Sequence, residues 1–323
     1  MPETTLTRTR RQAIALKKTE ANPAAVYLAS LAPSGRRTMA ARLTTVAHLM
    51  GGDPRAVDWS TLRFEHITAL RSRLSELGRA PASVNATLSA LRGVARASWQ
   101  LGRMTAEDYH RIAGVKNVRG SRLPAGRALT PGEISALLDA CAGDETAAGA
   151  RDAAVIALLY GAGLRRSEAA ALDLTHYDSK AIELKVRGKG NTERLVPLEA
   201  GGAAALNDWL NVRGVTVGPL LCPVRKGGKV EIRRMSAQAI YDALLKRGRE
   251  ARIPSLSPHD LRRTFASDLL DVSGDVSAVQ KLLGHANVQT TMRYDRRGEV
   301  AKRRAINLLH LPYRSRSSQK VKK

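Results

Sequence analysis

The chain has 323 residues, of which 43% are apolar and only 4% aromatic, a composition that excludes a globally disordered protein and favours helices. Its 53 lysines and arginines outnumber 29 acidic residues and give a net charge of +24, which indicates a polyanionic partner such as nucleic acid. Cys141 and Cys222 are far apart and have no partner motif, so the sequence indicates no disulfide framework or zinc site and fits a reducing cytoplasm. No apolar run reaches membrane-spanning length, and no signal peptide is visible.

The first part of the chain is predicted to be a basic arm followed by a helical bundle. Residues 1–20 are polar and basic and predict a flexible arm. Within 21–115, apolar residues recur at helical spacing in five segments, interrupted at Gly51-Gly52 and Gly78. These helices are expected to begin at Asn22-Pro23, at Ser34, near Leu62, at Pro81 and near Met104. The pattern is typical of a small helical bundle.

A linker, a second domain and a basic tail are predicted next. Residues 116–128 are rich in Gly, Pro and basic side chains and lack periodicity, which predicts a linker that crosses a nucleic-acid backbone. The second domain, 129–312, opens with a helix start at Thr130-Pro131. Helices are expected to continue through Leu172. Two strands are then expected at 181–186 and 193–197, joined by a turn at 187–192. Further helices are expected at about 201–213, 235–249, 260–271, 276–283, 287–293 and 297–309. Residues 313–323 are a basic tail. The fold class is therefore mainly α with a small β-hairpin in the second domain.

Six residues in this second domain could together carry phosphoryl transfer. Arginine clamps a phosphodiester through two parallel hydrogen bonds, lysine on a glycine-bracketed turn can protonate a leaving oxygen, and a tyrosine among cations can act as a nucleophile. Each residue alone has an ordinary structural explanation, so the joint pattern matters. The candidates are Arg165, Lys189, His259, Arg262, His285 and Tyr294.

The segments around these residues resemble those of the tyrosine recombinase (phage integrase) family. Gly-Leu-Arg-x-Ser-Glu matches its first-arginine box at Arg165, and Gly-Lys-Gly-Asn-x-Glu-Arg-x-Val-Pro-Leu matches its hairpin-lysine box at Lys189. Ser-Pro-His-Asp-Leu-Arg-Arg-Thr-Phe-Ala-Ser matches the box that contains His259 and Arg262, while Leu-Leu-Gly-His and Thr-Thr-x-x-Tyr match those of His285 and Tyr294. The likeness covers about 127–310, and the bundle before it resembles the family's core-binding domain.

The resemblance implies site-specific breakage and rejoining of DNA through a 3′-phosphotyrosyl link at Tyr294. It implies that His259 transfers protons, that Lys189 protonates the 5′-oxygen, and that Arg165, Arg262 and His285 hold the phosphate. No metal and no nucleotide cofactor are implied. Four protomers would join two duplexes, each carrying an inverted-repeat site, and the segment 297–309 would dock on a neighbouring protomer.

A further prediction concerns contacts to DNA outside the reaction centre. The segment from Met235 to Arg249 has a polar and basic face that could lie in the major groove, with Ser236, Gln238 and Tyr241 as the readers. The alternative is that this face meets solvent or phosphates. In the first domain, Ser34, Thr38 and Arg92 are predicted to contact the DNA backbone.

Three alternative functions remain open from the sequence. A type IB topoisomerase uses similar residues, although the boxes at Arg165 and Lys189 and the small N-terminal bundle favour a recombinase. A non-catalytic DNA-binding regulator is possible in principle, but every catalytic position is filled. A basic protein of ribosomes or membrane surfaces would explain the charge but not the motifs. The target sequence, accessory proteins and biological role, whether phage, transposon, integrative element or chromosome resolution, are left open.

Overall fold

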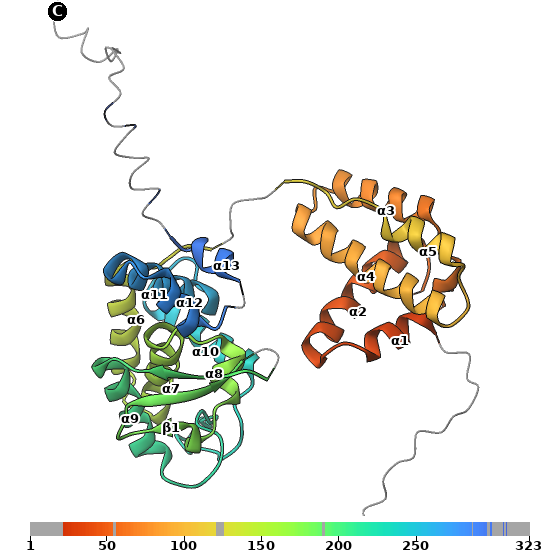
Figure 1. Ribbon diagram of the computed structural model, residues 1–323. Coiled ribbons are helices and arrows are strands. Elements are labelled where there is room, and N and C mark those ends of the chain that lie inside the picture. The colour runs from red at the N-terminus through yellow and green to blue at the C-terminus, as the bar shows by residue number, and fades with distance from the viewer. Residues whose placement is uncertain are drawn as a thin grey trace, which may run out of the picture. The chain divides into compact units, whose positions relative to one another are not determined.

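The computed structural model describes residues 22–53, 56–120, 126–188, 191–285 and 287–295, together with 298, 306 and 308. The chain divides between Pro124 and Ala125 into two compact units, which are drawn in red to yellow and in green to blue (Figure 1). Each unit has a hydrophobic core of its own. The predicted basic arm, the predicted tail and nearly all of the predicted helix 297–309 lie outside the described residues.

The N-terminal unit is a bundle of helices around α4. Its helices are α1 (Pro23–Ala29), α2 (Pro33–Leu49), α3 (Phe64–Glu76), α4 (Pro81–Gln100) and α5 (Ala106–Ala113). α4 buries Val84, Leu88 and Leu91, which recur at helical spacing, against the other helices. Gly93 allows α1 to approach, because a Cβ atom there would lie 2.2 Å from the ring of Tyr27.

The observed helix starts of this unit agree with the predicted capping signals, with one correction. The side chain of Asn22 accepts a hydrogen bond from the backbone of Ala24 and caps α1, as expected for asparagine at this position. α2, in contrast, begins at Pro33 and not at Ser34, because Ala32 occupies the N-cap position and proline is favoured in the first helical turn.

Both ends of the predicted linker are bound to the unit next to them. On the N-terminal side, the backbone N–H of Val118 donates to the side chain of Asn85, and the amide of Asn85 donates back to the carbonyl of Val118. On the C-terminal side, the carbonyl of Gly126 accepts a hydrogen bond from Arg263 at 2.6 Å. Residues at each end of 116–128 are therefore part of the packed units.

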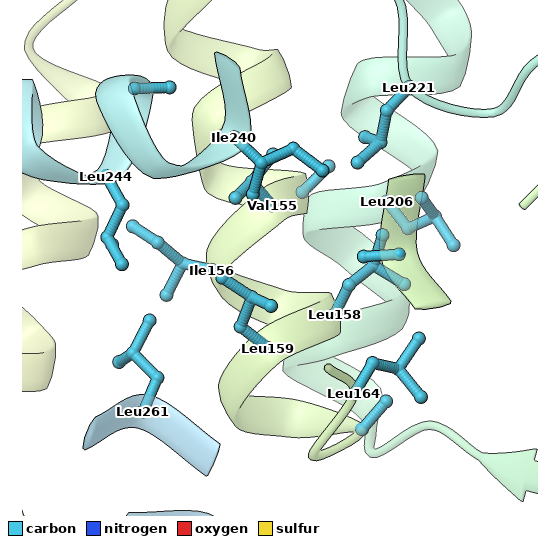
Figure 2. Packing of buried hydrophobic residues seen from close by; sticks show 14 of the residues in the cluster. Val155, Ile156, Leu158, Leu159, Leu164, Leu206, Leu221, Ile240, Leu244 and Leu261 are labelled. Atoms are coloured by element: carbon cyan, nitrogen blue, oxygen red, sulfur yellow. The ribbon is translucent and has the colours of Figure 1, made fainter. Parts of the chain in front are cut away.

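The C-terminal unit packs helices around a buried α7. Its helices are α6 (Pro131–Ala142), α7 (Ala147–Ile156), α8 (Arg166–Ala171), α9 (Ala200–Arg213), α10 (Ala237–Glu250), α11 (Pro258–Ser273), α12 (Val276–Leu283) and α13 (Val288–Met292). Figure 2 shows how Val155, Ile156, Leu158 and Leu159 fill the space between Leu206 of α9, Ile240 and Leu244 of α10, and Leu261 of α11. α7 continues into a π-helical turn, Ala157–Gly161, which leads towards Arg165.

A three-stranded antiparallel sheet completes this unit, in the order β1-β2-β3. β2 (Glu183–Arg187) pairs with β3 (Glu193–Pro197), and Leu184 lies opposite Val196, with both side chains buried. The predicted hairpin is thus confirmed. β1 (Tyr177–Asp178) was not predicted, because two residues are too few for an alternating pattern.

Two findings concern only the described ranges given above. No helix in them is long and apolar enough to cross a membrane. Their His, Cys, Asp and Glu side chains form no group of three that could hold a metal ion.

Candidate active site

The start of α11 presents His259 and Arg262 to one pocket. The side chain of Ser257 accepts a hydrogen bond from the backbone N–H of Asp260, which caps the helix so that it begins at Pro258. Residues three apart share one side of a helix, and both His259 and Arg262 line the pocket.

Arg262 is buried and held by backbone carbonyl groups. Its Nη1 donates to the carbonyl of Gly163 at 2.5 Å, and its Nη2 donates to the carbonyl of Leu283 at 2.7 Å. Burial and then the charge of Arg165 lower the pKa of Arg262 to about 10. Arg262 is nevertheless a cation at neutral pH, in a fixed orientation.

The backbone of Gly163 makes this contact possible. Its φ of +60° is one that L side chains rarely adopt, and a Cβ atom there would lie 2.3 Å from the ring of Phe265. The π-helical turn at Ala157–Gly161 comes directly before it, and such turns are frequent at functional sites. This glycine therefore lets α11 lie against the loop that carries Arg165.

Glu168 is the buried carboxylate among three arginines of the site. Its Oε1 accepts a hydrogen bond from Arg165 Nη1 at 2.7 Å, its Oε2 accepts one from Arg194 Nη2 at 2.9 Å, and Arg262 Nη1 lies 3.8 Å from Oε2. Oε2 also accepts the backbone N–H of Arg165, which caps α8. Burial by itself would raise the pKa of Glu168, but the hydrogen bonds from Arg194 and Arg165 outweigh it, and the pKa is lowered.

Sequence reasoning assigned no role to Glu168 or Arg194, although signals for both exist. Glu168 follows Arg165 by three residues, the spacing at which a glutamate caps a helix. Arg194 shares a face of β3 with buried Val196, so strand alternation turns it inwards. It also donates from Nε to the carbonyl of Leu282 at 2.8 Å, which connects β3 to the end of α12.

His285 lies behind Arg262 and uses both ring nitrogens. Nε2 is 3.0 Å from Arg262 Nη2, and Nδ1 is 2.9 Å from the hydroxyl of Thr291. Because the guanidinium can only donate, Nε2 accepts and Nδ1 carries the proton. Burial and then the charge of Arg262 lower the pKa of His285 to about 4. The histidine is neutral at pH 7 and orients the guanidinium.

This pKa predicts a loss of stability in mild acid. An unfolded chain binds a proton at a histidine near pH 6.5, whereas the folded chain resists it until about pH 4, so stability falls as the pH falls between these values. We expect the melting temperature of His285→Gln to fall less over this range than that of the unchanged protein. Thermal unfolding from pH 8 to pH 4 measures this. Exposed His48 provides the control, and an identical pH profile for His285→Gln and His48→Gln would contradict the prediction.

Tyr294 lies two residues after the end of α13 and is packed against both histidines. Its ring centroid lies 6.1 Å from that of His259 and 5.9 Å from that of His285, and the guanidinium carbon of Arg263 lies 5.9 Å from it. The hydroxyl of Ser267 donates to the carbonyl of Tyr294 at 3.0 Å, which fixes the chain at this position. Only 6% of the side chain is exposed.

The pocket beside these residues is open to solvent and lined by cations. Its lining residues are Arg165, Arg166, Ser167, Tyr241, Ser257, Pro258, His259 and Arg262. His259 is exposed there. Even so, its pKa is lowered, first because neighbouring protein removes part of its hydration and then because Arg263 and Arg262 repel the charged form. A neutral imidazole at the pocket can accept a proton.

Lys189 lies outside the described residues, in the sequence between β2 and β3. The backbone N–H of Gly188 donates to the carbonyl of Thr192 at 2.7 Å, which closes the β2–β3 hairpin around it. The structure therefore places the base of the turn and not the lysine itself.

The predicted groove readers on α10 have contacts of their own. Ser236 is the N-cap, and its hydroxyl accepts the backbone N–H of Ala239 at 3.0 Å. The amide of Gln238 donates to Asp242 at 2.9 Å and is exposed. Tyr241 faces the pocket, with the guanidinium of Arg166 5.5 Å from its ring centroid.

The three predicted backbone contacts of the first unit have different outcomes. The side chain of Ser34 lies outside the described part of the structure, and Thr38 is exposed on α2. Arg92, in contrast, donates to the side chain of Asn117 at 3.1 Å and to the carbonyl of Val115. Its guanidinium connects α4 to the segment after α5.

Comparisons with known proteins point in one direction. The sequence pattern of the "Phage integrase family" matches residues 127–299. The chain is 34% identical to tyrosine recombinase XerC of Shewanella amazonensis over 242 residues, which cover 73% of this chain and 77% of the relative. It is 35% identical to XerC of Alcanivorax borkumensis over 254 residues, covering 76% and 78%.

Solved structures share the fold at low sequence identity. An integrase of the Tn1549 transposon in complex with transposon right-end DNA has a TM-score of 0.61 at 16% identity and covers 88% of this chain and 100% of its own. A lambda integrase dimer bound to a core site has a TM-score of 0.60 at 15% identity and covers 83% and 91%.

The fold, the relatives and the pocket define a tyrosine-type site-specific DNA recombinase. The chain belongs to the phage integrase family.

Proposed function

We propose that Tyr294 is the nucleophile of this recombinase and forms a 3′-phosphotyrosyl link to DNA without a metal ion or nucleotide. The observation that supports this most directly is the position of Tyr294 between His259 and His285, beside a pocket lined by Arg165 and Arg262. Fixed cations at a phosphate stabilise the charge that develops in the transition state, which a metal ion does in other enzymes.

The reaction conserves a phosphodiester bond. The oxygen of Tyr294 attacks phosphorus and the bond to the 5′-oxygen breaks, while His259, neutral because its pKa is lowered, accepts the tyrosine proton. Lys189 gives a proton to the 5′-oxygen. Arg165 and Arg262 bind the non-bridging oxygens, and His285 acts through Arg262 by orienting it. Rejoining reverses these steps with a new 5′-hydroxyl.

The substrate is double-stranded DNA with an inverted-repeat site, bound in the cytoplasm. The net charge of +24 suits this partner. We assign 21–115 to core DNA binding and 129–312 to catalysis, with four protomers on two synapsed duplexes. Gln238 on α10 is the groove reader whose exposed amide best fits an adenine.

A nicked suicide duplex tests the proposal. Loss of the short fragment beyond the cleavage point prevents rejoining, so the unchanged protein should accumulate a covalent adduct in excess chelator without ATP. Peptide mapping should find DNA attached to Tyr294 through its 3′ end. A 5′ linkage, or an adduct that requires a divalent ion for the cleavage step, would refute it.

The role of Lys189 has a test of its own. Lys189→Ala should slow cleavage of ordinary DNA by roughly 10²–10⁴-fold, the usual contribution of a positioned acid. A duplex with sulfur in place of the bridging 5′-oxygen needs no protonation, so it should recover most of the rate. Single-turnover cleavage measures both, and Lys185→Ala on β2 is the control, because Lys185 pairs with Glu193. An equal defect on both duplexes would assign Lys189 another role.

A further inference from the structure

Arg166 and Tyr241 form a pair at the edge of the pocket. Arg166 is the first residue of α8 and directly follows Arg165, and its guanidinium carbon lies 5.5 Å from the ring centroid of Tyr241 on α10. Both side chains line the same pocket as His259 and Arg262. A cation at this distance from an aromatic ring is attracted to its face.

Arg166 differs from the neighbouring arginines, because no carboxylate of the described residues pairs with it. Arg165 and Arg194 are paired with Glu168, and Arg234 with Asp173. Within the described part of the chain, Arg166 makes no ion pair, and it is exposed. The Tyr241 ring thus supports a guanidinium whose N–H groups remain available to an anion.

The two consecutive arginines hold their guanidinium groups on different partners. Arg165 is paired with Glu168, and Arg166 lies against the ring of Tyr241, yet both line one pocket. A DNA strand bound at this pocket would present more than one phosphate to the pair, because phosphates follow one another along each strand with an axial rise of ~3.4 Å.

We propose that Arg166, supported by the ring of Tyr241, binds a phosphate adjacent to the one that Tyr294 attacks and so positions the strand for cleavage. This inference depends on the proposed function and assigns Tyr241 to supporting Arg166 rather than to reading a base. In this proposal Arg166 binds the substrate directly, whereas Tyr241 is the positioning residue, because it acts through Arg166.

Duplexes with a single neutral methylphosphonate provide the test. Each duplex replaces one phosphate at or next to the cleavage point. We expect Arg166→Ala to weaken binding of the unmodified duplex about tenfold, the scale of one charged hydrogen bond, and to lower the salt slope by about one. That penalty should vanish on the one duplex whose neutral position is the phosphate that Arg166 contacts.

Variants of Tyr241 separate ring support from hydroxyl contacts. Tyr241→Phe keeps the ring and should bind like the unchanged protein, whereas Tyr241→Leu should reproduce most of the Arg166→Ala defect. If Tyr241→Phe instead changes the preferred base, the ring-support role is refuted.

Three further outcomes would overturn the proposal. Arg166→Ala could bind and cleave normally, its penalty could be equal on every modified duplex, or the penalty could vanish only at the cleaved phosphate itself. The suicide duplex distinguishes these from failure of the proposed function, because they leave the Tyr294 adduct of the unchanged protein intact.

Discussion

Replacing Tyr294 by phenylalanine is expected to abolish covalent capture of DNA and leave DNA binding unchanged. The substitution removes only the hydroxyl oxygen, while the ring still packs against His259, His285 and Arg263. Loss of a catalytic nucleophile reduces the rate by on the order of 10⁵-fold or more. Single-turnover cleavage of the suicide duplex and equilibrium binding measure the two effects separately.

Tyr177 provides the matched control for this substitution. Its hydroxyl, at the start of β1, is buried without a hydrogen-bond partner among the described residues, so Tyr177→Phe should cleave at the normal rate. An adduct that still forms with Tyr294→Phe would place the nucleophile on another residue.

Glu168→Ala is expected to damage both stability and cleavage. Without this carboxylate, Arg165, Arg194 and Arg262 repel one another around a buried site. Breaking one partner of a buried ion pair costs about 3–5 kcal/mol of unfolding free energy. A displacement of about 1 Å in the phosphate clamp can slow the reaction roughly 100-fold. Urea unfolding and single-turnover cleavage test the two expectations.

Glu231 offers a carboxylate with similar partners in a different environment. It pairs with Arg225 and Arg233, but these arginines are 71% and 65% exposed, so solvent screens the interaction. Glu231→Ala should therefore unfold and cleave nearly as the unchanged protein does. Glu168→Gln keeps an acceptor for the backbone N–H of Arg165. Its unfolding free energy and its cleavage rate should therefore lie between those of Glu168→Ala and Glu231→Ala. Equal behaviour of Glu168→Ala and Glu231→Ala would show that the buried charge is unimportant.

Features of the fold that depend on local sequence were predictable. Apolar periodicity and capping residues such as Ser257 are local properties, and the predicted helices of the described residues begin and end within a few positions of those observed. The π-helical turn at Ala157–Gly161 was not predicted, because its residues do not differ in apolar pattern from those of an α-helix. The motifs of the family predicted one site that contains His259, Arg262, His285 and Tyr294, and these four residues do lie close together in the structure.

Interactions between distant segments were not predictable in the same way. Arg194 and Glu168 are 26 residues apart, and only the packing of β3 beside α8 shows that they meet. Surface arginines are also alike in sequence, so their contacts within the protein could not be predicted. The guanidinium of Arg92 is bound to the segment after α5, whereas Arg166, which received no assignment, lies at the pocket. The DNA contact predicted for Arg92 stays a prediction.

The two carbonyl groups that hold Arg262 tie its orientation to the folding of the whole C-terminal unit. They belong to Gly163 and Leu283, which are 120 positions apart in the chain and are brought together by the fold. A partly folded chain that has not brought these two segments together would lack the alignment of this guanidinium, even though it contains the residue itself.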